Sequence, residues 1–126
     1  MVIADTSVWI SFFRSPDSRE KQALDALIDA DEVALVGVVL AELLQGCRAA
    51  KERDAVKDAM LALPYLEMTR ELWIRVGELS SALLRRGVTL PIPDLVVAGI
   101  AIEHHCRVYS LDTHFQKIPD LPRYIP

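Results

Sequence analysis

Short apolar runs alternate with longer stretches of helical periodicity along the chain, and this alternation constrains the fold more than any other feature of the sequence. Apolar residues in the longer stretches recur at the spacing of helices that cover a sheet with one face. Strands that alternate with helices favour a mostly parallel sheet with helices on both faces. We therefore predict an α/β fold with three layers, α/β/α, around a central sheet of four or five strands. The predicted strands are Val2–Ala4, Val33–Val36, Leu66–Met68 and Arg107–Leu111.

Helix boundaries are predicted from capping residues and helix breakers. Thr69 is a suitable N-cap for a long amphipathic helix that Gly87 can end. Asp94 can cap a helix running from Leu95 to about Glu103, after a stiff loop at Pro91 and Pro93. The proline-containing tail is expected to add an edge strand or to wrap the surface. The other predicted helices are Val8–Phe13, a segment around Ala23–Ile28, Val38–Cys47 and Lys51–Leu63.

Composition excludes several classes of protein. The 126 residues fit a single domain, residues 1–126, and 14 Lys and Arg against 18 Asp and Glu give a net charge of −4. A net anion cannot hold phosphates by charge alone, so nucleic-acid chemistry here would need cations from solution. No apolar run reaches the roughly 18–20 residues of a membrane span, and the N-terminus lacks the basic region of a signal peptide. Cys47 and Cys106 match no zinc spacing and favour a reducing cytoplasm.

Two acids directly follow the first and last predicted strands. Asp5 follows Val2–Ala4, and Asp112 follows the strand that ends at Leu111. Aspartate is a preferred helix N-cap and turn residue, so capping explains each of them taken alone. The carboxyl ends of parallel strands, however, meet at the edge of the sheet where ligands bind. Both carboxylates are therefore expected at that edge.

Two further acids lie in or beside strongly apolar helices. The neighbours of Glu42 in Val38–Cys47 are so apolar that we predict a buried helix. A lone buried carboxylate costs several kcal/mol unless it is paired or bound to a cation. Asp94 precedes eight consecutive apolar residues, Leu95–Ile102, and either caps that helix or belongs to a site.

Four carboxylates at one edge of a sheet would repel one another unless a cation lies among them. Hard divalent ions such as Mg²⁺ prefer oxygen ligands and often bind a few carboxylates together with water and phosphate. Such ions can activate water and stabilise a leaving oxygen in phosphodiester hydrolysis. The four acids therefore indicate a metal site that could act on phosphate esters.

Four motifs, in order along the chain, resemble those of the PIN-domain nucleases. Each is weak alone, but together they cover the chain and are highly specific. The last resembles Thr-x-Asp-x-x-Phe, with serine in place of the threonine. The compact length is most similar to that of the VapC-type toxins of type II toxin–antitoxin pairs. The motifs are Met1–Ile10, Val39–Gly46, Arg86-Gly87 with Pro93–Ala98, and Ser110–Phe115.

This resemblance implies an endoribonuclease that depends on Mg²⁺ or Mn²⁺. It also implies an RNA substrate, a homodimer and an antitoxin partner whose tail enters the active-site groove. Thr6 and Ser110 would be supporting hydroxyls, and many relatives have another acid near the position of His114. The acidic set that holds the metal would be Asp5, Glu42, Asp94 and Asp112.

An alternative is a non-catalytic protein-binding module on the same fold, favoured by the acidic composition and by a cluster of large apolar side chains near the N-terminus. One helix face cannot bury the whole cluster, so part of it either completes the core or lines a groove for a partner helix. A phosphoacceptor receiver domain has a similar length but needs an acidic pair where Asp5 stands alone. The cluster is Trp9, Ile10, Phe12 and Phe13.

Overall fold

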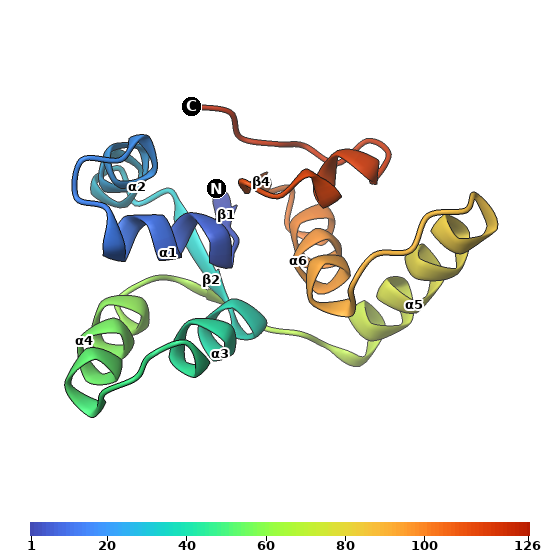
Figure 1. Ribbon diagram of the computed structural model, residues 1–126. Coiled ribbons are helices and arrows are strands. Elements are labelled where there is room, and N and C mark those ends of the chain that lie inside the picture. The colour runs from blue at the N-terminus through green and yellow to red at the C-terminus, as the bar shows by residue number, and fades with distance from the viewer.

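The computed structural model describes residues 1–126 and contains one parallel sheet of four strands (Figure 1). The strand order is β3-β2-β1-β4, and every neighbouring pair is parallel. This arrangement confirms the predicted α/β class and the lower of the two predicted strand numbers. The strands are β1 Val2–Ala4, β2 Val33–Val36, β3 Tyr65–Leu66 and β4 Arg107–Tyr109.

Helices cover both faces of the sheet, as predicted. In Figure 1, α1, α2 and α4 lie on one side of the sheet, and α5 and α6 lie on the other. Helix α3 contacts α1, α4 and α6. The helices are α1 Thr6–Arg14, α2 Arg19–Asp29, α3 Gly37–Gln45, α4 Ala50–Leu61, α5 Arg70–Arg85 and α6 Ile92–Glu103, followed by the short 3₁₀ helix η1, Thr113–Lys117.

Helix α6 is the most deeply buried helix, with every residue from Leu95 to Ala101 buried. It packs against β4, α3 and α5, which explains a segment that is apolar on all sides. Gly99 allows the close approach to α5, since an added Cβ would lie 2.9 Å from Cγ2 of Val76.

Helix α6 begins earlier than predicted. Its N-cap is Pro91 and Asp94 lies within its first turn, so of the two alternatives for Asp94 the capping one was wrong. The two prolines do not form a separate loop, because the first turn of a helix does not use its amide hydrogens and tolerates proline. As a result, the Asp94 carboxylate is not used for capping.

The ends of two other predicted elements also shift. The third strand begins one residue and ends two residues earlier than predicted, and β4 ends at Tyr109 rather than Leu111. Ser110 and Leu111 therefore leave the sheet and form the loop that leads to η1. The tail does reach the sheet edge, but only through an isolated parallel bridge between Val108 and Arg123.

The register of β1 and β4 brings two predicted site segments side by side. Ala4 pairs with Tyr109, and the Asp5 amide donates to the Tyr109 carbonyl at 2.9 Å. The residues after both strands therefore leave the sheet at the same edge.

None of the helices has the length and apolar character needed to cross a bilayer.

Candidate active site

Asp5 lies directly after β1 and is the N-cap of α1, where its Oδ1 accepts a hydrogen bond from the Val8 amide at 3.4 Å. Only 8% of the residue is exposed. Burial raises the pKa of Asp5 above its usual value, although hydrogen bonds from Ser110, Ser7 and the backbone oppose that rise. The capping explanation is thus correct for Asp5, but the carboxylate is also a buried acid at the functional edge of the sheet.

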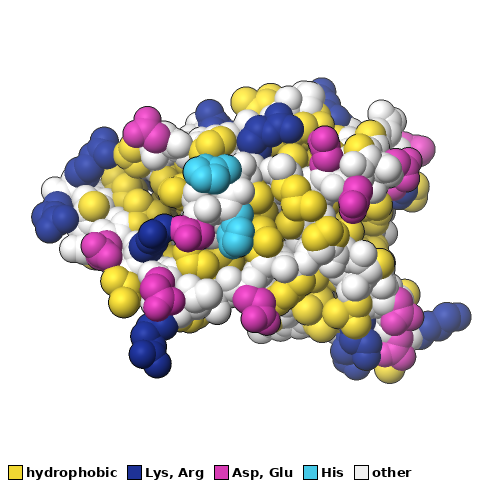
Figure 2. Space-filling model, turned by 180° about the vertical axis from the view of Figure 1, so that it is seen from behind, with side chains coloured by type: hydrophobic (Ala, Val, Ile, Leu, Met, Phe, Trp, Pro, Cys, Tyr) yellow, Lys and Arg dark blue, Asp and Glu magenta, His cyan; other side chains and the backbone are white.

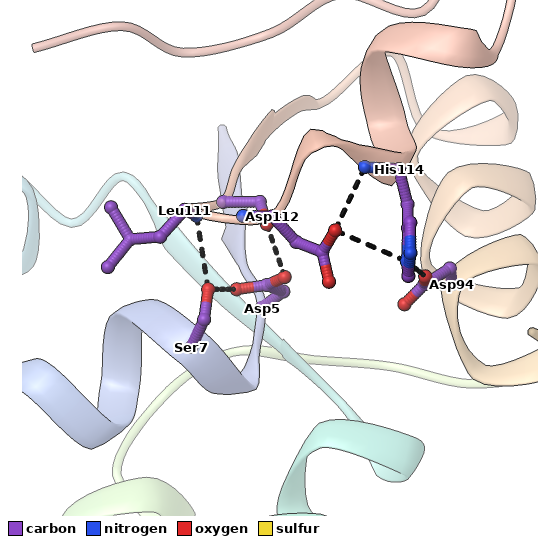
Figure 3. Close-up of polar contacts among 7 residues, drawn as sticks. Asp5, Ser7, Asp94, Leu111, Asp112 and His114 are labelled. Carbon is purple, nitrogen blue, oxygen red and sulfur yellow. Dashed lines mark hydrogen bonds and ion pairs between the residues drawn. The ribbon is translucent and has the colours of Figure 1, made fainter.

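Two serine hydroxyls connect Asp5 to the loop after β4 (Figure 3). Ser110 Oγ donates to Asp5 Oδ2 and accepts from the Asp112 amide at 2.8 Å. Ser7 Oγ donates to Asp5 Oδ1 and accepts from the Leu111 amide at 3.1 Å. These bonds orient the Asp5 carboxylate and fix the position of the Asp112 backbone. The sequence motifs indicated Ser110 as a supporting hydroxyl but did not indicate Ser7. The only sequence feature that could have identified Ser7 is its position two residues after Asp5.

Asp94 and Asp112 approach the same imidazole ring from different elements. Asp112 is the N-cap of η1, and its Oδ1 accepts from the His114 amide at 2.9 Å. His114 Nδ1 lies 2.6 Å from Asp94 Oδ2 and 3.2 Å from Asp112 Oδ1. Figure 3 shows the Asp112 carboxylate between Asp5 on one side and the Asp94–His114 pair on the other.

These three side chains are arranged as metal ligands would be. One ligand atom each from Asp94, Asp112 and His114 lies within 4.8 Å of the other two. Two carboxylate oxygens and an imidazole nitrogen suit a divalent ion such as Mn²⁺, and water or phosphate oxygens can complete the coordination. The exposed fractions of the side chains are 20% for Asp94 and 38% for Asp112, which leaves both accessible. The donor set therefore fits the divalent ion that the sequence motifs imply.

Glu42 is placed differently from the sequence expectation. It is exposed on α3, so the prediction of a buried carboxylate was wrong. Helix α3 fully buries only the stripe formed by Val39 and Leu43, and the face that carries Glu42 opens toward a cavity beside α4. Thr6 Oγ1 donates to Glu42 Oε1 at 2.8 Å, which ties α3 to the residue after Asp5. Neither Asp5 nor Glu42 belongs to the close group of three ligating side chains.

The N-terminal apolar cluster divides between the core and two surface cavities. Trp9 is 1% exposed and belongs to the core, whereas Ile10 is 41% exposed. Ile10 and Phe13 line a cavity of about 290 Å³ between α1, α3 and α4, which Glu42 also lines. Phe12 and Trp9 line a second cavity, of about 310 Å³, between α1, α2 and α4.

Basic side chains do not form a continuous surface for nucleic acid on the face seen from behind. In Figure 2, the dark blue Lys and Arg side chains stand singly or in small groups among acidic and apolar ones. This distribution agrees with the net charge of −4. On this face, charge alone offers no extended binding surface for phosphates.

Comparison with known proteins gives consistent matches over nearly the whole chain. The family model of the PIN domain matches residues 2–121. The chain is 26% identical over 122 residues to the Mycobacterium tuberculosis protein named ribonuclease VapC11, covering 94% of this chain and 91% of that protein.

Solved structures show the same fold. VapBC2 from Rickettsia felis, bound to a DNA fragment from its promoter, superposes with a TM-score of 0.84 at 22% identity and covers 98% of both chains. A toxin–antitoxin complex from Klebsiella pneumoniae superposes with a TM-score of 0.73 at 23% identity, covering 96% of this chain and 95% of that one. At these identities, the structural matches establish the fold alone.

Proposed function

Because this chain belongs to the PIN-domain family, we propose that it is a metal-dependent endoribonuclease and the toxin of a toxin–antitoxin pair. The observation that carries the proposal is the group formed by Asp94, Asp112 and His114, beside the buried Asp5, at the carboxyl edge of the sheet. The similarity to a protein named ribonuclease VapC11 supports RNA as the substrate.

In the proposed site, Asp94 and Asp112 would hold Mg²⁺ or Mn²⁺, and Asp5 and Glu42 would complete the acidic set. When bound, such an ion supplies an activated water and offsets the charge that develops on the phosphate. Ser7 and Ser110 hold the Asp5 carboxylate in place, and Thr6 holds Glu42. A cation at this edge would also let an acidic protein bind an RNA phosphate.

The apolar cavities beside α1 and the similarity to a toxin–antitoxin complex support an antitoxin as the protein partner. Apolar cavities lie on either side of α1, and both are large enough for side chains of a docked segment. Glu42 lines one of these cavities, so a segment bound there would reach the proposed metal site. The structural similarity to a toxin–antitoxin complex agrees with this partner.

A candidate surface for the proposed homodimer lies at β3, α5 and α6, away from the two cavities beside α1. Tyr65, Trp73 and Ile92 are each about half exposed, and they line one apolar cavity together with Met68. Large apolar side chains gathered on a surface are typical of interfaces.

We also propose that the protein acts in the cytoplasm, since both of its cysteines are free thiols.

The test is an RNA cleavage assay with and without EDTA on the wild type and on Asp5→Asn and Asp94→Asn. Both variants should lose metal-dependent cleavage, while the matched control Asp29→Asn, an exposed aspartate at the end of α2, should retain it. Circular dichroism must show that all variants are folded. Wild-type cleavage rates in both site variants would reject the site assignment.

The alternative, a non-catalytic binding module, is favoured by the same two apolar cavities. It predicts a stable complex with a protein partner but neither metal binding nor RNA cleavage. Calorimetry with MnCl₂ and MgCl₂ distinguishes the two functions, because only the nuclease should bind either ion.

A further inference from the structure

His114 occupies a position between two partly exposed carboxylates of the site, Asp94 and Asp112. Its Nδ1 is within hydrogen-bonding distance of Asp94 Oδ2, at 2.6 Å, and close to Asp112 Oδ1, at 3.2 Å. The ring therefore directs Nδ1, rather than Nε2, at the place where the two acids converge (Figure 3). A ring nitrogen in this position either donates a hydrogen bond to the two carboxylates or binds the same cation as they do.

The backbone around His114 holds the ring at this position. The His114 amide donates to Asp112 Oδ1 at 2.9 Å, and the next residue, Phe115, is 1% exposed and anchors η1 in the core. The His114 side chain itself is 38% exposed, so an ion and its water ligands can reach Nδ1. An anchored ring beside two accessible carboxylates is pre-organised to bind a metal ion.

On the basis of the proposed metal-dependent function, we propose that His114 is itself a metal ligand, binding through Nδ1, and that it makes the site select Mn²⁺ over Mg²⁺. Mg²⁺ favours an all-oxygen shell and gives up its waters reluctantly. Mn²⁺ is an ion of the first transition row and accepts imidazole nitrogen alongside carboxylate oxygen more readily than Mg²⁺, an alkaline-earth ion, does. Replacing the nitrogen by a carboxylate oxygen should therefore reduce the preference for Mn²⁺.

The first experiment measures dissociation constants for MnCl₂ and MgCl₂ by titration calorimetry. The proteins are the wild type, His114→Ala, His114→Asp and the matched control His104→Ala, an exposed histidine at the end of α6. We expect His114→Ala to bind Mn²⁺ about tenfold or more weakly, the scale typical of a disturbed metal site. His114→Asp should lower the ratio of Mn²⁺ to Mg²⁺ affinity, and His104→Ala should change neither constant. An unchanged ratio in His114→Asp would overturn the proposal.

The second experiment detects the nitrogen directly. Electron spin echo spectroscopy of the wild-type protein with one equivalent of Mn²⁺ should show coupling to a directly bound ¹⁴N nucleus. This coupling should vanish in His114→Ala and persist in His104→Ala. Because the wild-type spectrum is informative by itself, the test does not depend on the folding of a variant.

The outcomes separate this proposal from the proposed function. If Mn²⁺ binds without nitrogen coupling while RNA cleavage remains sensitive to EDTA, the ligand role of His114 is wrong and the nuclease function stands. If neither ion binds the wild type, both proposals are wrong.

Discussion

The substitution Ser7→Ala tests whether a hydroxyl that the motifs do not single out supports the buried acid of the site. Ser7 Oγ donates to Asp5 Oδ1 and accepts from the Leu111 amide, so alanine removes both bonds. Asp5 is buried and its pKa is already raised by desolvation. Losing a donor to the charged form should raise the pKa further and destabilise the folded protein most where Asp5 is ionised.

The size of the effect follows from the charge on the acceptor. A hydrogen bond to a charged group contributes about 1.5–3 kcal/mol, and one to a neutral group contributes about 0.5–1.5 kcal/mol. For a chain of 126 residues, a loss of about 2 kcal/mol lowers the thermal midpoint by roughly 7 °C. We therefore expect the thermal midpoint of Ser7→Ala to lie about 7 °C below that of the wild type at pH 8. This difference should shrink to about 4 °C as the pH falls and Asp5 takes up a proton.

The assay is thermal denaturation of the metal-free wild type and variant, followed by circular dichroism between pH 4 and pH 8. The matched control is Ser11→Ala on the same helix, whose hydroxyl makes only a long bond of 3.3 Å to Glu20 Oε1. The control should stay within about 2 °C of the wild type at every pH. The reasoning would be refuted if the midpoint of Ser7→Ala equalled that of the wild type, or if the difference between them were equally large at pH 4 and pH 8.

Other consequences can be measured with the same denaturation assay. Asp5→Asn should change the midpoint of the metal-free protein more favourably at pH 8 than at pH 4, because burial disfavours the charged carboxylate of the wild type and asparagine carries no charge; a change that is less favourable at pH 8 than at pH 4 would contradict the raised pKa. Gly77→Ala should stabilise α5 by about 1 kcal/mol, since nothing lies within 4 Å of the added methyl. Gly99→Ala should instead destabilise by about 1 kcal/mol, because its Cβ would lie 2.9 Å from Val76 Cγ2; equal effects of the two substitutions would show that this contact is not tight. Mn²⁺ at about 100 times its dissociation constant should stabilise the wild type by about 2.7 kcal/mol, and Asp94→Asn should show no such gain.

The layered fold was predictable because its signals are local. The run Val33–Val36 forms β2 with the predicted bounds, and Thr69 caps α5 through a bond from the Leu72 amide at 3.1 Å. Apolar periodicity and capping residues act within a few positions of the chain, so they can be read without knowing the tertiary contacts. The short strand β3 was predicted with both ends displaced, by one residue at its start and two at its end, because so short a run has little periodicity to define it.

The errors at the site arose where tertiary geometry decides the role of a residue. Asp94 could be read as a cap, but the structure starts the helix at Ile92 and leaves the carboxylate facing His114. The apolar neighbours of Glu42 suggested burial, yet its face of α3 opens toward a cavity. Helical spacing defines a face of a helix but does not show what covers that face.

The contacts of Ser7 and His114 were beyond the reach of sequence patterns for a different reason. Ser7 binds the Leu111 amide 104 positions away, and His114 meets Asp94 across 20 positions. These contacts depend on the parallel register of β1 and β4 and on the start of α6. No spacing rule connects residues from such separate elements.

The central claim is that Asp94 and Asp112 bind a divalent ion at the edge of the sheet. Anomalous diffraction from crystals soaked in MnCl₂ tests this claim most directly, because the signal locates manganese independently of any activity. We predict a manganese peak in contact with carboxylate oxygens of both residues, and no peak there in Asp94→Asn crystals soaked in the same way. Manganese found only elsewhere on the wild-type protein, or no manganese at all, would contradict the claim.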